Sequence, residues 1–286
     1  MKVLILGQTG QVARALIRRA EAGMTVTASG RDKVDLADRA ACTAAILASD
    51  ADVVINAAAF TAVDLAESAG PGLGRINADA PGAMAAACAR RGVPFIQLST
   101  DYVFEGAGDQ PRLPTDEPAP INAYGNSKLA GERQVRAAGG NSLILRTSWV
   151  FSTEGSNFVK TILRLGRERD SLNVVADQVG GPTPANDLAD AMLTAARAMH
   201  LGKPGGIHHL AGAPDTTWAD FARAILAGAG LECRIIDITS SDYPAAARRP
   251  KNSRLDCTSF EEQFGVSRPD WRAGLKMVLV ELGAQQ

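Results

Sequence analysis

The chain has 286 residues and a formal net charge of −1, with 46% hydrophobic and 21% charged residues. These values are typical of a soluble globular protein and give no electrostatic reason to expect nucleic acid or a membrane as a partner. The four widely spaced cysteines form no C-x-x-C pair, which argues against a zinc site or a disulfide framework and favours a cytoplasmic location.

Short apolar runs alternate with longer Ala- and Arg-rich segments over the first 150 residues. The runs predict strands, and the longer segments predict helices because their apolar residues recur at helical spacing. The expected strands are 3–6, 25–29, 52–58, 94–100 and 142–148, and the expected helices are 11–23, 39–49, 81–92 and 122–140, closed in three cases by Gly23, Gly92 and Gly139. This alternation indicates an α/β fold with a doubly wound, Rossmann-like parallel sheet covered on both faces.

The regularity weakens in the second half of the chain. Prolines and glycines cluster before Asn186, which we expect to be the N-cap of a helix over 187–199. A strand at 205–212 and a helix at 216–230 follow, and the tail 231–286 mixes a strand, an Arg/Pro loop and two short helices.

This organisation predicts two domains. The first, over 1–148, is a NAD(P)-binding domain, to which the chain returns at about 186–212. The second, formed mainly by 149–286, is a smaller α/β substrate domain.

A loop of small residues follows the first expected strand. Gly7, Gly10 and Ala13 give the spacing G-x-x-G-x-x-A, which resembles the loop of short-chain dehydrogenase/reductase enzymes. Small residues let the backbone approach a pyrophosphate, which would lie at the positive end of the following helix. A plain turn is the alternative, but the position directly after the first strand favours a dinucleotide site.

The second expected strand ends in a short polar segment that includes Arg31. An arginine at this point of a dinucleotide-binding fold suits the 2′-phosphate of NADPH, to which it can form charge-assisted hydrogen bonds. A solvated loop arginine remains the alternative interpretation. We therefore expect NADPH as the cofactor, with some use of NADH.

Three residues suggest the chemistry. Thr100 lies at the end of a central strand, and Tyr124 and Lys128 follow at helical spacing, one turn apart. Reducing a ketone requires hydride at carbon and a proton at oxygen, and a free tyrosine with a pKa of about 10 exchanges protons slowly at neutral pH. We expect Lys128 to lower the pKa of Tyr124 and to bond the nicotinamide ribose, while Thr100 orients the substrate carbonyl.

These residues, together with longer segments, resemble the dTDP-4-dehydrorhamnose reductase family of extended short-chain reductases over nearly the whole chain. The most particular segments are GQTGQV, DVVINAAAFTAVDLAES, LSTDYVFEG, YGNSKLAGE, RTSWVF, NFVKTILRL, DQVGGPT and ARRPKNSRLD. The resemblance implies reduction of the 4-keto group of dTDP-4-dehydro-L-rhamnose by NAD(P)H, the last step of dTDP-L-rhamnose synthesis.

The resemblance also implies roles for individual residues. Tyr124 would be the proton donor with Lys128 as its partner, and both would also contact the cofactor. The other implied cofactor-binding residues are Gly7, Gly10, Gln11, Val12, Arg31, Asp35, Leu36, Ala59, Phe60, Thr61 and Leu98, and the implied substrate contacts are Thr100, Asp101, Trp149, Arg248 and Arg249. Trp149 could instead be a core aromatic, and which of the two arginines contacts the diphosphate stays open.

One departure from the family concerns metal. Some members bind Mg²⁺ through acidic residues at a dimer interface, whereas Ala15 and Asn186 occupy the matching positions here. We therefore expect no Mg²⁺ requirement and either a monomer or a homodimer, with a nucleotide sugar as the small-molecule partner. The alternatives are another nucleotide-sugar epimerase or reductase of the same superfamily, or a non-catalytic NADP-binding regulatory subunit.

Overall fold

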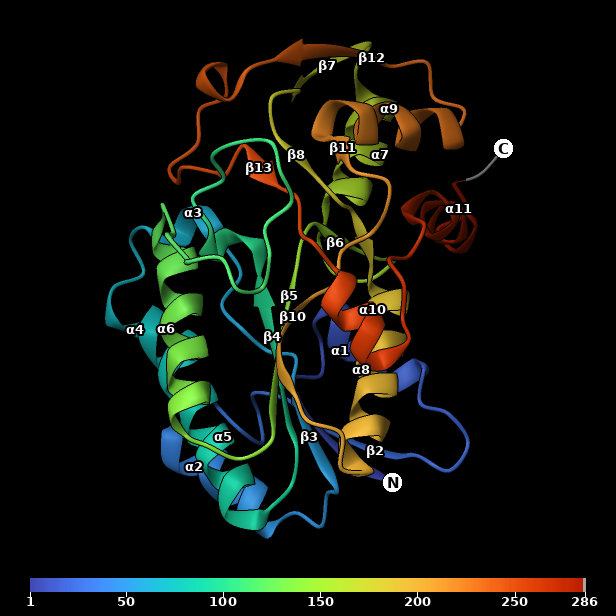
Figure 1. Cartoon of the computed structure of the whole chain (residues 1–286). Helices are drawn as coiled ribbons and strands as arrows, with labels where there is room; N and C mark the ends of the chain where they lie inside the picture. The colour runs from blue at the N-terminus through green and yellow to red at the C-terminus, as the bar shows by residue number, and fades with distance from the viewer. Residues whose placement is uncertain (285–286) are drawn as a thin grey trace.

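A six-stranded parallel sheet forms the centre of the computed structural model, which describes residues 1–284 (Figure 1). The strand order is β10-β5-β4-β3-β1-β2. The strands are β1 (Lys2–Leu6), β2 (Thr25–Ser29), β3 (Val53–Asn56), β4 (Phe95–Thr100), β5 (Ser142–Thr147) and β10 (Gly206–His209). The order reverses between β1 and β3, and ligands of such sheets bind beyond the carboxyl ends of the strands at this point. The doubly wound, Rossmann-like sheet predicted from the sequence is confirmed.

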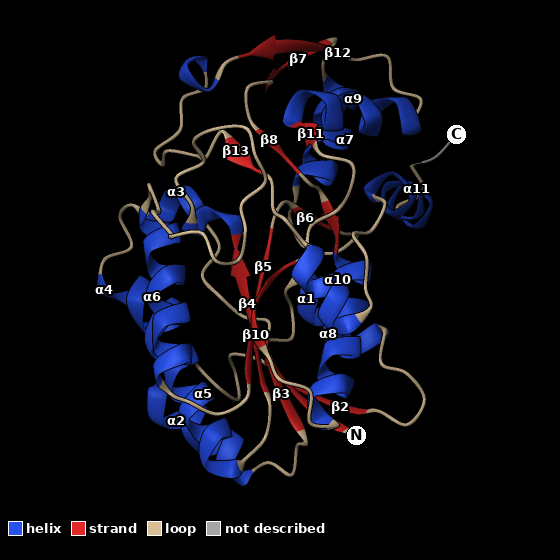
Figure 2. Ribbon diagram, viewed as in Figure 1, coloured by secondary structure: helices blue, strands red, loops and turns tan. Residues whose placement is uncertain are grey.

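Helices cover both faces of this sheet (Figure 2). One face carries α1 (Gln11–Arg18), α8 (Ala185–His200) and α10 (Thr258–Phe264), and the other carries α2 (Arg39–Ala48), α5 (Ala80–Arg91) and α6 (Ala123–Ala137). Successive side chains of a strand point to opposite faces. Accordingly, Ile5 of β1 packs in the core beneath α1 and α8, while Leu4 and Leu6 pack in the core beneath α2 and α5.

Short helical turns connect β3 to α5. They comprise α3 (Val63–Ala66), α4 (Pro71–Gly74) and a π-helical turn over Arg75–Asp79, and a 3₁₀ turn over Asp101–Val103 follows β4. None of these turns was expected from the sequence, since they carry no apolar periodicity of their own.

A second core lies at the top of Figure 1, beyond the carboxyl ends of the sheet strands. It is formed by α7 (Phe158–Glu168), α9 (Trp218–Gly228), α11 (Trp271–Glu281) and the paired strands β7 (Ser171–Val175) and β12 (Arg234–Ile238). The remaining elements here are β6 (Val150–Phe151), β8 (Val179–Gly180), β9 (Thr183–Pro184), β11 (Thr216–Thr217), a 3₁₀ turn over Ser240–Asp242 and β13 (Asn252–Ser253). The elements α7 and β7 were not expected, although Val159, Ile162 and Leu163 recur at helical spacing behind the N-cap Asn157.

Two expected helix ends were wrong. Pro184, not Asn186, is the N-cap of α8, and Asn186 lies in the first turn of the helix. The first helix ends at Arg18, so Gly23 does not close it and instead lies in the turn before β2. Gly92 does close its helix in the left-handed conformation.

The chain leaves the sheet after β5 and returns to it, since β10 pairs with β5 at the edge. The division into domains over 1–148 and 149–286 stays a prediction, and residues 285 and 286 lie outside the described part. Along residues 1–284, no helix combines the length and apolar character needed to cross a bilayer.

Candidate active site

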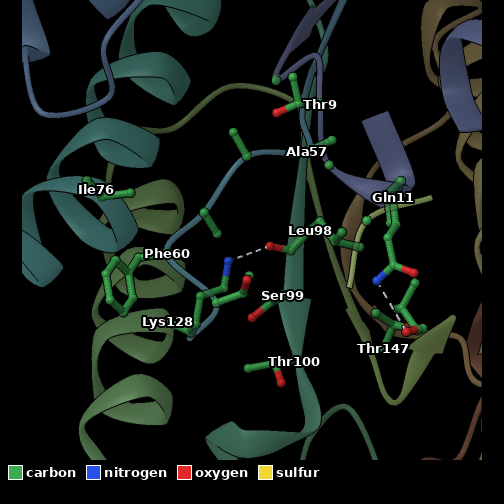
Figure 3. Close-up of a pocket in the computed structure, with 18 of the residues that line it drawn as sticks. Thr9, Gln11, Ala57, Phe60, Ile76, Leu98, Ser99, Thr100, Lys128 and Thr147 are labelled. Carbon is green, nitrogen blue, oxygen red and sulfur yellow. Dashed lines mark hydrogen bonds between the residues drawn. The ribbon is translucent and has the colours of Figure 1, made fainter. Parts of the chain in front are cut away.

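A cavity of about 890 Å³ opens at the carboxyl ends of the central strands. Figure 3 shows residues from the loop after β1, from the end of β4 and from α6 around it. Of the residues predicted to bind cofactor or substrate, the cavity is lined by Gly7, Gly10, Gln11, Val12, Arg31, Asp35, Leu36, Ala59, Phe60, Thr61, Leu98, Thr100, Asp101, Tyr124, Lys128 and Trp149. Segments more than 100 residues apart in the sequence therefore meet at one site.

The glycine loop has the form that a pyrophosphate requires. Gly7 has a positive φ of 115°, and a Cβ at this position would press against Ala58. Gly10 is the N-cap of α1, and among residues 1–284 no side-chain cap hydrogen bond is made at this helix end. An unfilled helix N-terminus with no Cβ in the way fits a bound phosphate group.

Gln11 connects this loop to the second half of the chain. Its Nε2 donates to the Val150 carbonyl at 3.4 Å, and its Oε1 accepts from Ser152 and Asn157. These bonds fix the side chain at one edge of the cavity.

The region expected for the adenosine half is open to solvent. The side chain of Arg31 is 83% exposed, and its Nε lies 3.7 Å from Asp35 Oδ2. An exposed guanidinium at this cavity edge is free to turn toward a ligand phosphate, because a single long, exposed ion pair holds it only weakly.

The helix α6 carries the tyrosine and the lysine. Asn122 caps it by accepting from the Gly125 N–H at 2.7 Å. Gly125 and Gly131 lie inside the helix, where glycine is unfavourable, because a Cβ there would overlap the carbonyl oxygens of Tyr102 and Asn77 respectively. The glycines of YGNSKLAGE thus let α6 lie directly against the neighbouring backbone.

Asn77 is a buried residue that sequence reasoning missed. Its side chain accepts from the Phe60 N–H at 2.8 Å and donates to the Phe60 carbonyl at 3.0 Å. It also donates to Ser127 of α6 at 2.9 Å. Asn77 therefore holds the cavity segment around Phe60 against the helix.

Tyr124 and Lys128 are both buried. Burial raises the pKa of the Tyr124 phenol, and the neighbouring Thr100 hydroxyl opposes the rise. Lys128 Nζ donates to the Leu98 carbonyl at 2.8 Å (Figure 3), and burial lowers the pKa of this ammonium to about 8. The expectation that Lys128 lowers the pKa of Tyr124 is wrong, because the Leu98 carbonyl accepts from the ammonium and burial dominates at the phenol.

Thr100 and Asp101 lie beside the tyrosine. Thr100 Oγ1 donates to Asp101 Oδ1 at 3.0 Å and accepts from the Tyr102 N–H at 3.2 Å. Burial raises the pKa of the Asp101 carboxyl to about 6, while the hydroxyls of Ser253 and Thr100 oppose the rise. Asp101 is 3% exposed.

Trp149 has a left-handed backbone, with φ of 49°, which is uncommon for a bulky residue. Its indole stacks on Trp218 with 3.7 Å between ring centroids and 14° between ring planes. Both rings line the cavity. Trp218 was not predicted, because it lies 69 residues from Trp149 at the start of α9 and reads as part of an amphipathic helix.

The structure brings neither Arg248 nor Arg249 into the lining of the cavity. Arg249 Nη2 donates to Asp64 Oδ2 at 2.6 Å, and the Arg248 carbonyl accepts from the Asn122 side chain at 2.8 Å. Of the two, Arg248 has the exposed side chain. Their contact with a diphosphate stays a prediction.

The positions that carry metal-binding acids in some relatives have other contacts here. Ala15 is fully buried in α1, and Asn186 Oδ1 accepts from Arg18 Nη2 at 3.4 Å. Over residues 1–284, no group of three or more His, Cys, Asp or Glu side chains could hold a metal ion.

A family model and an individual relative both match nearly the whole chain and point to the same family. The family described as RmlD substrate binding domain matches residues 1–283. A dTDP-4-dehydrorhamnose reductase from Sinorhizobium fredii is 42% identical, over 98% of this chain and 97% of the relative.

Solved structures of similar fold belong to the same family. A dTDP-4-dehydrorhamnose reductase from Clostridium acetobutylicum has a TM-score of 0.93 at 35% identity, over 99% of this chain and 100% of the other. A dTDP-4-dehydrorhamnose reductase from Bacillus anthracis in complex with NADP has a TM-score of 0.91 at 31% identity, over 98% of this chain and 99% of the other.

Proposed function

The chain belongs to the dTDP-4-dehydrorhamnose reductase family, and we propose on that basis that it reduces the 4-keto group of dTDP-4-dehydro-L-rhamnose to give dTDP-L-rhamnose, with NADPH as the reductant. The observation that carries this proposal is that Thr100, Tyr124 and Lys128 line one cavity together with the glycine loop. Membership of the family indicates the substrate, and the cavity contains the side chains that the reduction needs.

The cofactor would contribute hydride when bound, and side chains of this protein bind and protonate the carbonyl oxygen of the substrate. Thr100 donates a hydrogen bond to this oxygen and orients it. Tyr124 gives it the phenolic proton. A buried site strengthens both interactions, because little water competes for the developing negative charge.

The loop after β1 is the proposed cradle of the pyrophosphate, supported by the positive φ of Gly7 and by the uncapped N-terminus of α1. Arg31 would contact the 2′-phosphate, with Asp35 and Leu36 beside the adenine. Lys128 would bond the nicotinamide ribose through the ammonium that now donates to Leu98. The remaining cofactor contacts would be Gln11, Val12, Ala59, Phe60 and Thr61.

The substrate half of the cavity would be formed by Asp101 and Trp149, with Arg248 or Arg249 near the diphosphate. Arg248 is the better candidate, since its side chain is exposed while Arg249 is paired with Asp64. We further propose a cytoplasmic enzyme that is a monomer or a homodimer.

The direct test is to follow NADPH absorbance with purified protein and dTDP-4-dehydro-L-rhamnose, and then to identify the sugar product. Stoichiometric oxidation of NADPH with formation of dTDP-L-rhamnose is expected. An epimerase would give a different sugar without net cofactor consumption, and that result would contradict the proposal.

Wild-type turnover separates an enzyme from a non-catalytic NADP-binding subunit, and Tyr124→Phe then tests the proton donor. We expect the variant to lose kcat by on the order of 10²-fold or more and to bind NADPH as the wild type does, because only the proton donor is removed. Unchanged turnover in Tyr124→Phe would show that this tyrosine is not the donor.

A further inference from the structure

The Asp101 carboxyl is buried at the wall of the active-site cavity and is only partly satisfied. Its Oδ1 accepts from Thr100, whereas Oδ2 has no hydrogen-bond partner within the part of the chain that the structure describes. A buried carboxylate with an unpaired oxygen is costly, and protonation relieves the cost by removing the charge. This environment makes the carboxyl easier to protonate than an exposed one.

We infer that Asp101 stores a proton and delivers it to Tyr124 through the hydroxyl of Thr100, so that the tyrosine is restored within the site. The inference rests on the proposed reduction and adds to it the source of the proton that replaces the one given to the sugar.

The hydroxyl of Thr100 has the connections that such a transfer requires. A hydroxyl has one proton and two acceptor positions. One acceptor position is taken by the Tyr102 N–H at 3.2 Å. The other is available to the Asp101 carboxyl, whose Oδ1 lies 3.0 Å away, and the proton is available to the neighbouring Tyr124, which lines the same cavity and whose pKa the Thr100 hydroxyl lowers.

The transfer balances in protons and charge. Once the substrate oxygen has taken the phenolic proton, Tyr124 is a phenolate. Thr100 gives its proton to the phenolate oxygen while taking the proton of Asp101. The O–H bond of Asp101 breaks, the O–H bond of Tyr124 forms, Thr100 ends as it began, and the negative charge moves to Asp101. Solvent restores the carboxyl proton after the product leaves.

Thr100 has a single proton, so its two tasks follow one another. It first donates to the substrate carbonyl, and this bond is no longer needed once the oxygen has become a hydroxyl. The same hydroxyl then turns its proton to Tyr124.

The surroundings of Asp101 support exchange near neutral pH. The groups that face it are Tyr124 from α6, Tyr102 in the following 3₁₀ turn and Ser253 from β13, none of which carries charge at neutral pH. Arg249 and Asp64 lie further out and act on Tyr102. Burial raises the pKa of Asp101 to about 6, and the neighbouring Ser253 hydroxyl opposes the rise.

The test compares the pH dependence of kcat in the wild type, Asp101→Asn and Ser253→Ala, at saturating NADPH and dTDP-4-dehydrorhamnose. Wild-type kcat should fall as pH rises through the pKa of Asp101, because the relay loses its proton. Asp101→Asn should lack this fall and stay on the order of tenfold below the wild-type low-pH rate. Ser253→Ala should shift the fall to higher pH, because the hydroxyl that lowers the carboxyl pKa is gone.

Persistence of the fall in Asp101→Asn, or an unmoved midpoint in Ser253→Ala, would overturn the relay. An Asp101 that only binds the sugar would raise KM and leave the pH midpoint of Ser253→Ala in place. Lys128, with a pKa of about 8, titrates separately at higher pH. NADPH binding and thermal unfolding report whether the variants fold. If Asp101→Asn does not fold, the pH midpoint of Ser253→Ala decides the test. Wild-type turnover tests the proposed function, so the two proposals can fail separately.

Discussion

Glu132 and Arg146 form an ion pair in the protein interior, with 2.7 Å between Glu132 Oε2 and Arg146 Nη2 and only 2% of each side chain exposed. Arg146 Nε donates to the other carboxylate oxygen at 3.0 Å, and Ser99 donates to this same oxygen at 2.5 Å. The pair therefore connects α6, β5 and β4, the last of which ends in Thr100. Within α6, Glu132 lies one helical turn beyond Lys128.

Removing one partner of this pair should destabilise the fold strongly, because the other charge is left buried and unpaired. We expect Glu132→Ala and Arg146→Ala each to lower the free energy of unfolding by about 3–5 kcal/mol. Urea denaturation measures the loss. As a matched control, the double variant Glu132→Leu/Arg146→Met, which buries no charge, should be more stable than either single variant. A loss of under about 1 kcal/mol in both single variants would show that the pair contributes little.

Affinity for NADPH should decrease at alkaline pH if Lys128 holds the nicotinamide ribose. The ammonium has a pKa of about 8, lowered by burial, so it is charged below this pH and loses its charge as pH rises through it. Fluorescence titration with NADPH between about pH 7 and pH 9.5 should show progressive weakening in the wild type. Lys128→Met should bind more weakly and with a flat profile over this range. A wild-type affinity that does not change with pH would contradict the assignment.

Arg31→Ala should raise KM for NADPH far more than KM for NADH. The guanidinium would form charge-assisted bonds to the 2′-phosphate, a group that NADH lacks. Because Arg31 is highly exposed, we expect a change on the order of tenfold for NADPH. Initial rates with each cofactor measure the effect. Equal changes in KM for the two cofactors would mean that Arg31 does not bind the 2′-phosphate.

Trp218→Ala should weaken sugar binding while leaving NADPH binding unchanged. Trp218 stacks on Trp149 and holds its indole at the cavity wall despite the unusual backbone of Trp149. An aromatic pair contributes about 0.5–1.5 kcal/mol, which corresponds to a rise in KM for the nucleotide sugar of up to about tenfold. Trp218→Phe keeps an aromatic face and serves as the control. If Trp218→Ala weakened NADPH binding more than sugar binding, the stacked tryptophans would not belong to the sugar site.

Treatment with EDTA should leave the activity unchanged. Ala15 and Asn186 stand where some relatives carry metal-binding acids, and neither side chain supplies a carboxylate. Rates measured after EDTA, and again with added Mg²⁺, give the answer. Activity that is lost with EDTA and restored by Mg²⁺ would contradict the prediction.

Local patterns predicted the sheet and much of the cavity lining. The glycine loop, the strand end at Thr100 and the Tyr124–Lys128 pair are each confined to a few residues of sequence, so each can be recognised locally. The resemblance to the family added residues such as Trp149 that no spacing would have identified.

Contacts between distant segments could not be read in this way. Ser253 affects the pKa of Asp101 from 152 residues away in sequence, and Trp218 stacks on Trp149 across another long separation. The pKa of Tyr124 was misjudged for the same reason, because Lys128 finds its partner in the Leu98 carbonyl of a neighbouring strand. Asn186 resembled a helix cap, but the helix begins one residue before it, directly after Pro184, whose backbone is extended.

The return of the chain to the sheet at β10 has a consequence for protein engineering and for evolution. A chimaera that exchanged everything after residue 148 with a relative would transplant α8 and β10 as well, and with them part of the layer that packs against α1. Substrate preference is therefore better altered by grafting separate surface segments, such as that around Trp218, than by swapping halves of the gene. Recombination in nature would meet the same obstacle, which favours divergence by point substitution in this architecture.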